Sequence, residues 1–272
     1  MRIALGLEYD GAAFTGWQTQ PDGRGAQDAL ERALAAIAGG PTATICAGRT
    51  DTGVHALDQV VHFDTTARRP PGAWVRGVNG FLPAAMAVRW ACEVPEAFHA
   101  RFGAVRRTYD YWILNDPVRS PLAHGRAGWV FRPLDAAAMH EAAAQLVGRH
   151  DFTSFRSSEC QAASPVRDLR ELSVQRRGRL IRVRASANAF LHHMIRNIVG
   201  ALVQVGSGRR DAGWVAQILA ARNRAQGAPT FSPDGLYLVR VEYDPSFQLP
   251  VPSTSVPVCL DAYSDQDLRT DA

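Results

Sequence analysis

The sequence RIALGLEYD occupies residues 2–10, and QDALERALAAI occupies residues 27–37. The first stretch has the alternating pattern of a β-strand. In the second stretch apolar residues recur at helical spacing and Gly39-Gly40 follows, so we predict an amphipathic helix that ends there. A strand followed by a helix in this way begins an α+β fold.

The rest of the N-terminal half continues to alternate strands and helices. We predict strands over 43–48 and 58–64, a helix near 72–81 that ends at Pro83, and a strand over 86–94. This order is β-α-β-β-α-β, the split βαβ arrangement.

The C-terminal half repeats this order approximately. Its predicted strands cover 101–114, 166–176, 179–187 and 236–243, and its predicted helices cover 135–147, 191–205 and 212–222. We therefore predict two pseudo-symmetric α+β halves with mostly antiparallel sheets that meet at a central cleft, where a substrate site is favoured.

The expected divisions of the chain are an N-terminal half over 1–104, a C-terminal half over 105–245 and a tail over 246–272. The tail contains Pro250, Pro252 and Pro257, which favour an extended or disordered segment.

Composition indicates an ordinary globular protein of 272 residues, 46% hydrophobic and 21% charged. No apolar run approaches the roughly 20 residues that span a bilayer, and acidic residues interrupt the N-terminus too early for a signal peptide. We therefore expect a cytoplasmic protein without membrane attachment. Four widely separated cysteines, Cys46, Cys92, Cys160 and Cys259, indicate reduced structural thiols.

The basic residues are unusual in kind rather than in number. The net charge is +4, and all 30 basic residues are arginine. Codon usage in a GC-rich genome explains most of this bias. The guanidinium group nevertheless binds phosphate in a fork and stacks on bases, so the composition is compatible with a nucleic-acid partner.

Asp51 lies in the segment GRTDTGVH, residues 48–55, between two predicted strands. An arbitrary aspartate in such a turn most often caps local backbone amides. Arg49 stands two residues away, and in strand-like geometry both side chains project to the same side. A cationic neighbour keeps a reactive carboxylate ionised, so Asp51 is also a candidate catalytic residue.

The whole segment, continued by Gln59-Val60-Val61-His62-Phe63, resembles the active-site signature of the tRNA pseudouridine synthase A family. Further motifs similar to those of the family follow the same order between about residues 3 and 243. They lie at 9–11, 14–20, 79–83, 98–102, 107–111, 150–155 and 189–200.

This resemblance implies that the chain isomerises uridine to pseudouridine at positions thirty-eight, thirty-nine and forty of the tRNA anticodon stem-loop. It implies no metal, no organic cofactor, and a homodimer. Asp51 would be the essential nucleophile. Attack on ribose, attack on the base and abstraction of a ribose proton all remain open.

The resemblance also assigns substrate contacts. Tyr109 would stack on the flipped uracil, although a cross-strand aromatic is the commoner fate of a strand tyrosine. Tyr111 competes for this role because alternation points it the same way. Arg196, on an apolar helix, would pair with Asp51, against the alternative of a solvent-facing residue. Arg49 would contact RNA as a wedge or a phosphate ligand.

Other charged groups are weaker candidates. His192 and His193 suggest a metal site, but no cluster at ligand spacing supports one, so packing or RNA contact is favoured. Some of four arginine pairs are expected to line a tRNA groove. These pairs are Arg68-Arg69, Arg106-Arg107, Arg176-Arg177 and Arg209-Arg210.

Two alternative functions compete with this hypothesis. A glycoside-cleaving enzyme would need a second carboxylate, for which Asp10, Asp58 and Asp151 are candidates. An RNA-binding protein without catalysis would not need Asp51, so the intact motif argues against it.

Overall fold

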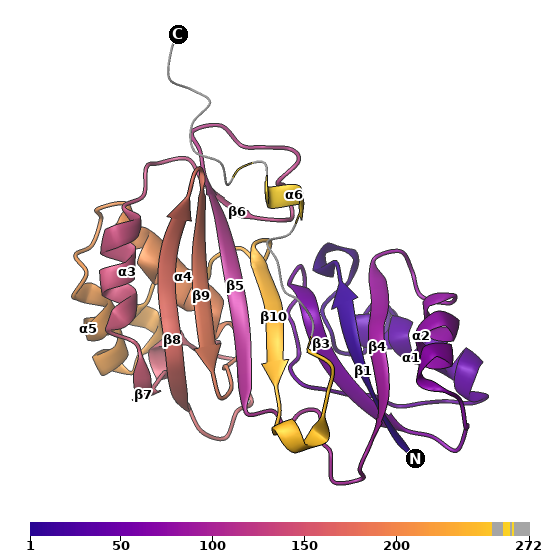
Figure 1. Cartoon of the computed structure of the whole chain (residues 1–272). Coiled ribbons are helices and arrows are strands. Elements are labelled where there is room, and N and C mark those ends of the chain that lie inside the picture. Colours follow the sequence, from indigo (N-terminus) through magenta and orange to yellow (C-terminus); the bar gives the residue numbers. More distant parts are fainter. Residues whose placement is uncertain (252–257, 262, 264–272) are drawn as a thin grey trace. The chain divides into compact units, whose positions relative to one another are not determined.

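The computed structural model describes residues 1–251, 258–261 and 263 (Figure 1). Its contacts divide the described chain into two units. Unit 1 consists of Met1–Arg107 and residues 237–251, and unit 2 consists of Thr108–Leu236 and the described residues from 258 onward. The expected division at 104 and 245 differs chiefly at the last strand, most of which belongs to unit 1.

Unit 1 follows the predicted β-α-β-β-α-β order and adds the last strand of the chain. Its elements are β1 (Arg2–Tyr9), α1 (Ala26–Ala38), β2 (Ile45–Cys46), β3 (His55–Asp64), α2 (Pro71–Asn79), β4 (Met86–Val94) and β10 (Leu236–Glu242). The strand order is β4-β1-β3-β10, with β2 beside β3. β1 is antiparallel to both β3 and β4, and β10 is parallel to β3.

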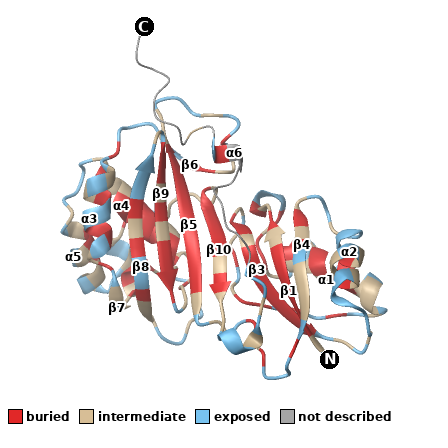
Figure 2. Cartoon of the chain, viewed as in Figure 1, coloured by how far each residue is buried: buried red, intermediate tan, exposed pale blue. Residues whose placement is uncertain are grey.

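The core of unit 1 lies between its strands and the helices on one of their faces (Figures 1 and 2). Leu5 pairs with Val61 in the β1–β3 ladder, and both are fully buried. The ring of Trp74 in α2 contacts Phe63 at 5.3 Å between centroids. Burying a side chain of this size contributes about 2 kcal/mol, so these contacts hold α2 against the strands.

Three strands in the first part of the chain were predicted with wrong boundaries. The strand predicted over 43–48 is reduced to Ile45–Cys46, and the strand predicted from 58 begins at His55. The strand predicted from 101 begins at Arg106. The residues before it form consecutive turns, because tertiary hydrogen bonds hold their backbone, as described below.

Unit 2 contains the remaining strands and helices. They are β5 (Arg106–Asn115), β6 (Gly128–Val130), α3 (Ala136–Ala144), β7 (Gly148–Asp151), β8 (Val166–Arg177), β9 (Leu180–Ala187), α4 (Met194–Gly206), α5 (Trp214–Ala221) and α6 (Val258–Asp261). The strand order is β5-β9-β8-β7, with β6 parallel to β5. α3 packs against β8 and α4 (Figure 1). β6 and β7 were not predicted, since strands so short show little alternation.

The strands predicted over 166–176 and 179–187 form an antiparallel β8–β9 hairpin, in which Arg177 pairs with Leu180 and Gly178-Arg179 form the connection. Gly178 has φ +54°, a backbone conformation that favours glycine. β9 also contacts β5 through successive side-chain pairs that run in opposite directions along the two strands. They are Thr108–Ser186, Asp110–Arg184 and Trp112–Arg182.

Parts of the expected tail are packed against the two units. Phe247 contacts Phe98 at 5.2 Å in unit 1, and Leu260 in α6 is fully buried. The Tyr263 hydroxyl lies 2.6 Å from Ser120 Oγ in unit 2. Apolar and aromatic anchors therefore order these segments, and the rest of the tail lies outside the described residues. Among the described helices, none is long and apolar enough to cross a membrane.

Candidate functional site

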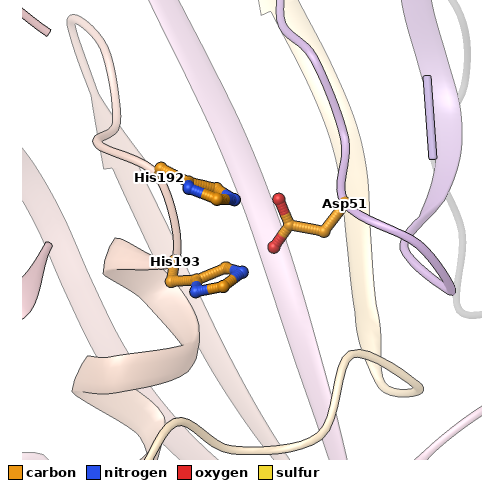
Figure 3. Close-up of side chains that lie close together, drawn as sticks. All are labelled: Asp51, His192 and His193. Carbon is orange, nitrogen blue, oxygen red and sulfur yellow. The ribbon is translucent and has the colours of Figure 1, made fainter. Parts of the chain in front are cut away.

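Asp51 lies in unit 1, in the irregular segment between β2 and β3, and its side chain is half-buried (Figure 3). The Val54 N–H donates to the main-chain carbonyl of Asp51 at 3.1 Å and closes the turn. Gly53, at φ +81°, occupies the left-handed position that this turn requires. The main chain alone therefore bends the segment at Asp51.

Side chains of β1 and β3 fix the residues just before Asp51. The Tyr9 hydroxyl and Thr50 Oγ1 are 2.8 Å apart in a buried contact. Gln59 Nε2 donates to the Gly48 carbonyl at 2.6 Å, and the same side chain is fully buried. Buried hydrogen bonds of this kind are costly to leave unmade, so they hold the segment in one conformation.

Two glycines allow neighbouring backbone to approach the Asp51 turn closely. A Cβ on Gly11 would lie 2.0 Å from the Val54 carbonyl oxygen, which no side chain tolerates. Gly16 has φ +94°, and a Cβ there would lie 3.2 Å from the Thr50 carbonyl oxygen. The next residue, Trp17, donates its N–H to that oxygen at 2.9 Å. The N-terminal motifs thus support the Asp51 segment.

His55 is the last residue of the Asp51 segment, and contacts of its ring hold it in place. Its ring stacks on Tyr237 at 4.5 Å between centroids, and its Nδ1 accepts the Gly11 N–H at 3.1 Å. Asp10 Oδ1 also lies 3.1 Å from this nitrogen. The end of the segment is therefore tied to β10 and to the residues after β1.

Arg49 is exposed, as a residue that contacts RNA must be. Cys46 lies beneath this region, and burial raises the pKa of its thiol to about 12, while the nearby Arg49 and Arg101 act to lower it. Cys46 is therefore a neutral thiol, which agrees with the structural role predicted for it. Its surroundings also show that Arg49 and Arg101 carry positive charge to the same part of unit 1.

Tyr109 and Tyr111 lie in β5 of unit 2, and the structure distinguishes them. The Tyr111 hydroxyl donates to the Ser232 carbonyl at 2.8 Å, and its ring is fully buried against Phe231. The Tyr109 ring makes an edge contact with Phe190, in the segment after β9, and retains 8% exposure. Tyr111 thus has a packing role.

Arg196 lies in the first turn of α4, where it is half-buried rather than on a solvent face. Its Nε donates to the Phe231 carbonyl at 2.8 Å, and the Phe231 N–H donates back to the Arg196 carbonyl. The adjacent Asn197 is buried, and its Oδ1 accepts from Thr230 Oγ1 and from Arg224. This network holds the Arg196 side chain and its helix turn in place.

His192 and His193 immediately precede α4, with ring centroids 3.9 Å apart (Figure 3). His193 has φ +62°, which is uncommon for a residue other than glycine. The His193 carbonyl accepts the Asn197 N–H, and the His192 carbonyl accepts the Ser157 N–H. Within unit 2 this pair forms the sharp entry into the helix that carries Arg196.

The carboxylates considered as alternatives have structural partners. Asp10 accepts from the Ala12 N–H, and Asp151 accepts from both the N–H and the hydroxyl of Thr153. Asp58 is buried in β3 and accepts the Val241 N–H at 3.0 Å. These contacts disfavour a second catalytic carboxylate at the three positions.

Two arginines from the basic pairs donate hydrogen bonds to other groups of the protein itself. Arg107 is buried and donates to the carbonyls of Ala47, Ala104 and Arg101. Arg176 donates to the Leu134 carbonyl and to Asn115 Oδ1. The expectation of a tRNA groove therefore does not extend to these two side chains.

The four predicted site residues are divided between the units, with Asp51 and Arg49 in unit 1 and Tyr109 and Arg196 in unit 2. The structure adds supporting residues that spacing alone did not identify, above all Thr50, Gln59 and Gly16. A hydrogen bond between residues 41 positions apart, such as Tyr9–Thr50, leaves no local signal in the sequence.

Comparison with known proteins identifies the family of this chain. The family model described as tRNA pseudouridine synthase matches residues 7–103 and 142–244. The tRNA pseudouridine synthase A of Herminiimonas arsenicoxydans is 58% identical over 253 residues, covering 92% of both chains. That of Burkholderia mallei is 55% identical over 270 residues, covering 99% of this chain and 100% of the relative. The chain therefore belongs to the tRNA pseudouridine synthase family.

Proposed function

We propose that this protein converts uridine to pseudouridine in the tRNA anticodon stem-loop, at positions thirty-eight, thirty-nine and forty. Membership of the family supports the reaction and the substrate class. The observation that carries the proposal is the Asp51 turn, because contacts on both sides fix the backbone that carries this half-buried carboxylate. Fixed presentation of the reacting group is what catalysis by positioning requires.

The reaction is an isomerisation and consumes no oxidant or second substrate. The bond between N1 and C1′ breaks, the uracil turns, and a bond forms between C5 and C1′. C5 then loses a proton, and N1 carries one in the product. Asp51 acts as the nucleophile or the base in this sequence.

Tyr109 is the residue proposed to stack on the flipped uracil, and its hydroxyl is proposed to assist loss of the C5 proton. The burial of Tyr111 and its bond to Ser232 favour Tyr109 over its neighbour. A base within a stem must leave the helix before chemistry can occur, and an aromatic ring stabilises it outside.

Arg196 is proposed to pair with Asp51 during the reaction. The bond from its Nε to the Phe231 carbonyl holds the side chain in place. A guanidinium beside Asp51 would keep the carboxylate ionised and oriented. Arg49, exposed in the same segment as Asp51, is proposed to contact the RNA backbone or to hold the vacated stem position.

We further propose a cytoplasmic homodimer. Segment 116–131 of unit 2 carries large exposed apolar side chains, Val118, Leu122, Trp129 and Phe131. Such a concentration is typical of a protein interface. A second copy of the chain is the proposed occupant, and sedimentation at micromolar concentration tests this assignment.

The decisive experiment maps pseudouridine in unmodified tRNA after treatment with the pure protein. We expect new pseudouridine at the three proposed positions with the wild type and none with Asp51→Ala, which should still bind tRNA. Product elsewhere would contradict the site assignment. Free uracil released without pseudouridine would instead favour the glycoside-cleaving alternative.

A further inference from the structure

A short loop of unit 1 carries a largely exposed aromatic side chain. Phe102 is 78% exposed, although large apolar side chains are normally buried where the chain allows it. The preceding residue, Arg101, is also exposed, and its guanidinium lies 5.5 Å from the centre of the Phe102 ring. The loop thus presents a flat apolar face with a positive charge beside it.

This loop, residues 98–103, is anchored too firmly for the exposure to result from disorder. Phe98 is fully buried against Tyr243 and Phe247. The Ala100 N–H donates to the buried His62 Nδ1 at 3.1 Å, and the Tyr243 hydroxyl donates to the Ala100 carbonyl at 2.7 Å. The base of the loop is therefore part of the core.

The exposed tip is fixed by His99. Its Nδ1 accepts the N–H groups of both Arg101 and Phe102, at 3.2 and 3.1 Å. Its ring also supports the Phe102 ring at 4.5 Å between centroids. Burial and the nearby Arg2 lower the pKa of His99, so the ring is neutral and able to accept near pH 7. The Phe102 ring is thus held in place before any partner binds.

The loop is connected to the Asp51 segment by one side chain. Arg107 Nη2 donates to the carbonyls of both Arg101 and Ala47, and Ala47 precedes Asp51 by four residues in the chain. Arg49 and Arg101 also act together on the buried Cys46. The aromatic tip and the candidate catalytic segment therefore share one positively charged region of unit 1.

We propose that Phe102 and Arg101 form a tRNA-contact site, in which the Phe102 ring stacks on an unpaired or flipped-out base and Arg101 binds an adjacent phosphate. The proposal rests on the proposed function for its substrate. Unstacked bases bind aromatic side chains in this way, and arginine is suited to the neighbouring phosphate. Because His99 already orders the ring, little conformational freedom is lost on binding.

Stacking and phosphate contact can be separated by the salt dependence of binding. We expect Phe102→Ala to weaken binding of unmodified tRNA by about tenfold, the range of one lost base–aromatic stack, without changing the slope of log K against log salt. Arg101→Gln should weaken binding less at high salt and lower the magnitude of that slope by about one. Phe102→Trp should bind like the wild type, whereas Phe102→Leu, which is apolar without an aromatic face, should resemble Phe102→Ala.

Phe81 provides a matched control, because it is an exposed aromatic of the same unit, at 62%, outside the proposed contact site. Phe81→Ala should retain wild-type affinity. Wild-type affinity in Phe102→Ala, or full recovery in Phe102→Leu, would overturn the stacking proposal. A Phe102→Ala variant that binds tRNA normally but changes the sedimentation of the free protein would also overturn the proposal. That result would identify a contact between protein copies.

The same preparations distinguish this inference from the proposed function. If the wild type forms pseudouridine but Phe102→Ala binds normally, the loop assignment alone fails. If the wild type forms none while Phe102→Ala still loses affinity, the contact site stands and the catalytic assignment fails.

Discussion

Two carboxylates of this protein occupy opposite kinds of environment. Asp51 lies on an irregular turn of unit 1 and is half-buried. Asp110 lies in β5 of unit 2, is 5% exposed, and binds Arg184 through two hydrogen bonds of 2.7 and 2.8 Å. The turn is held by its neighbours' side chains and glycines, while Asp110 is held by its own strand and ion pair.

The two sets of contacts hold different parts of the two residues. Both carboxylate oxygens of Asp110 in β5 accept hydrogen bonds from the guanidinium of Arg184 in β9. This ion pair therefore links two strands of unit 2. At Asp51, bonds to Thr50 and Gly48 and the Val54 N–H hold the segment that carries the carboxylate. The catalytic role proposed for Asp51 depends on this rigid backbone.

Asp51→Asn is the most severe test of this comparison. We expect pseudouridine formation to fall by roughly 10³-fold or more, because an amide is neither a nucleophile nor a base. The thermal midpoint should change by no more than a few degrees, since the backbone contacts of the turn remain. Single-turnover assays with unmodified tRNA measure the first quantity and calorimetry the second. A variant with substantial activity would remove Asp51 from the mechanism.

Asp110→Asn should show the converse pattern. Loss of the carboxylate leaves the Arg184 guanidinium without its partner, and breaking such a pair costs about 3 kcal/mol of unfolding free energy. Urea denaturation measures this loss, and the folded variant should retain most of its activity at low temperature. Arg184→Gln combined with Asp110→Asn should recover part of the stability. If the single variant unfolds like the wild type, the pair is not a structural element.

Sequence patterns predicted much of this architecture and only part of the site. The periodicity of α1 and the pair of strands predicted over 166–176 and 179–187 identified their elements, because such signals are local. The late start of the strand predicted from residue 101, at Arg106, was missed, since His62 and Tyr243, distant in the chain, bind the backbone of Ala100. No local pattern encodes those two hydrogen bonds.

The site shows the same limit. The motif around Asp51 was recognisable, and so were Tyr109 and Arg196, through resemblance. The reason for Gly11 and Gly16 was not visible, because they lie against the backbone of residues distant in the chain, Val54 and Thr50. The Asp51 segment is therefore held by contacts between residues distant in the sequence, which leave no local pattern.

Asp58 extends the comparison to a carboxylate in a strand without a bidentate guanidinium. Burial raises its pKa to about 6, against the lowering effects of the Val241 N–H and Arg240. The folded state therefore holds this proton more tightly than the unfolded state. The contribution of Asp58 to stability is greatest below about pH 4 and is lost as pH rises through about 6.

Asp58→Asn should remove that dependence, because asparagine retains an oxygen acceptor for the Val241 N–H without the charge. We expect the variant and the wild type to be similarly stable at pH 4, and the variant to be more stable at pH 8 by up to about 3 kcal/mol. Taking the difference between the two proteins at each pH cancels other groups such as His62, whose lowered pKa acts in the opposite direction. A constant difference from pH 4 to 8 would show that Asp58 does not titrate in this range.

Gly16→Ala tests the support of Asp51 with the smallest change. At φ +94° an alanine costs about 1 kcal/mol, and its Cβ would press on the Thr50 carbonyl and the Thr52 N–H at 3.2 and 3.3 Å. Gly39→Ala is a matched control, because Gly39 has φ +83° but nothing within 4 Å of an added Cβ. Both variants should lose similar stability, while only Gly16→Ala should lower the turnover rate, by about tenfold, through displacement of the Asp51 turn. Equal activity in the two variants would mean that the turn tolerates displacement, and that fixed presentation does not set Asp51 apart from Asp110.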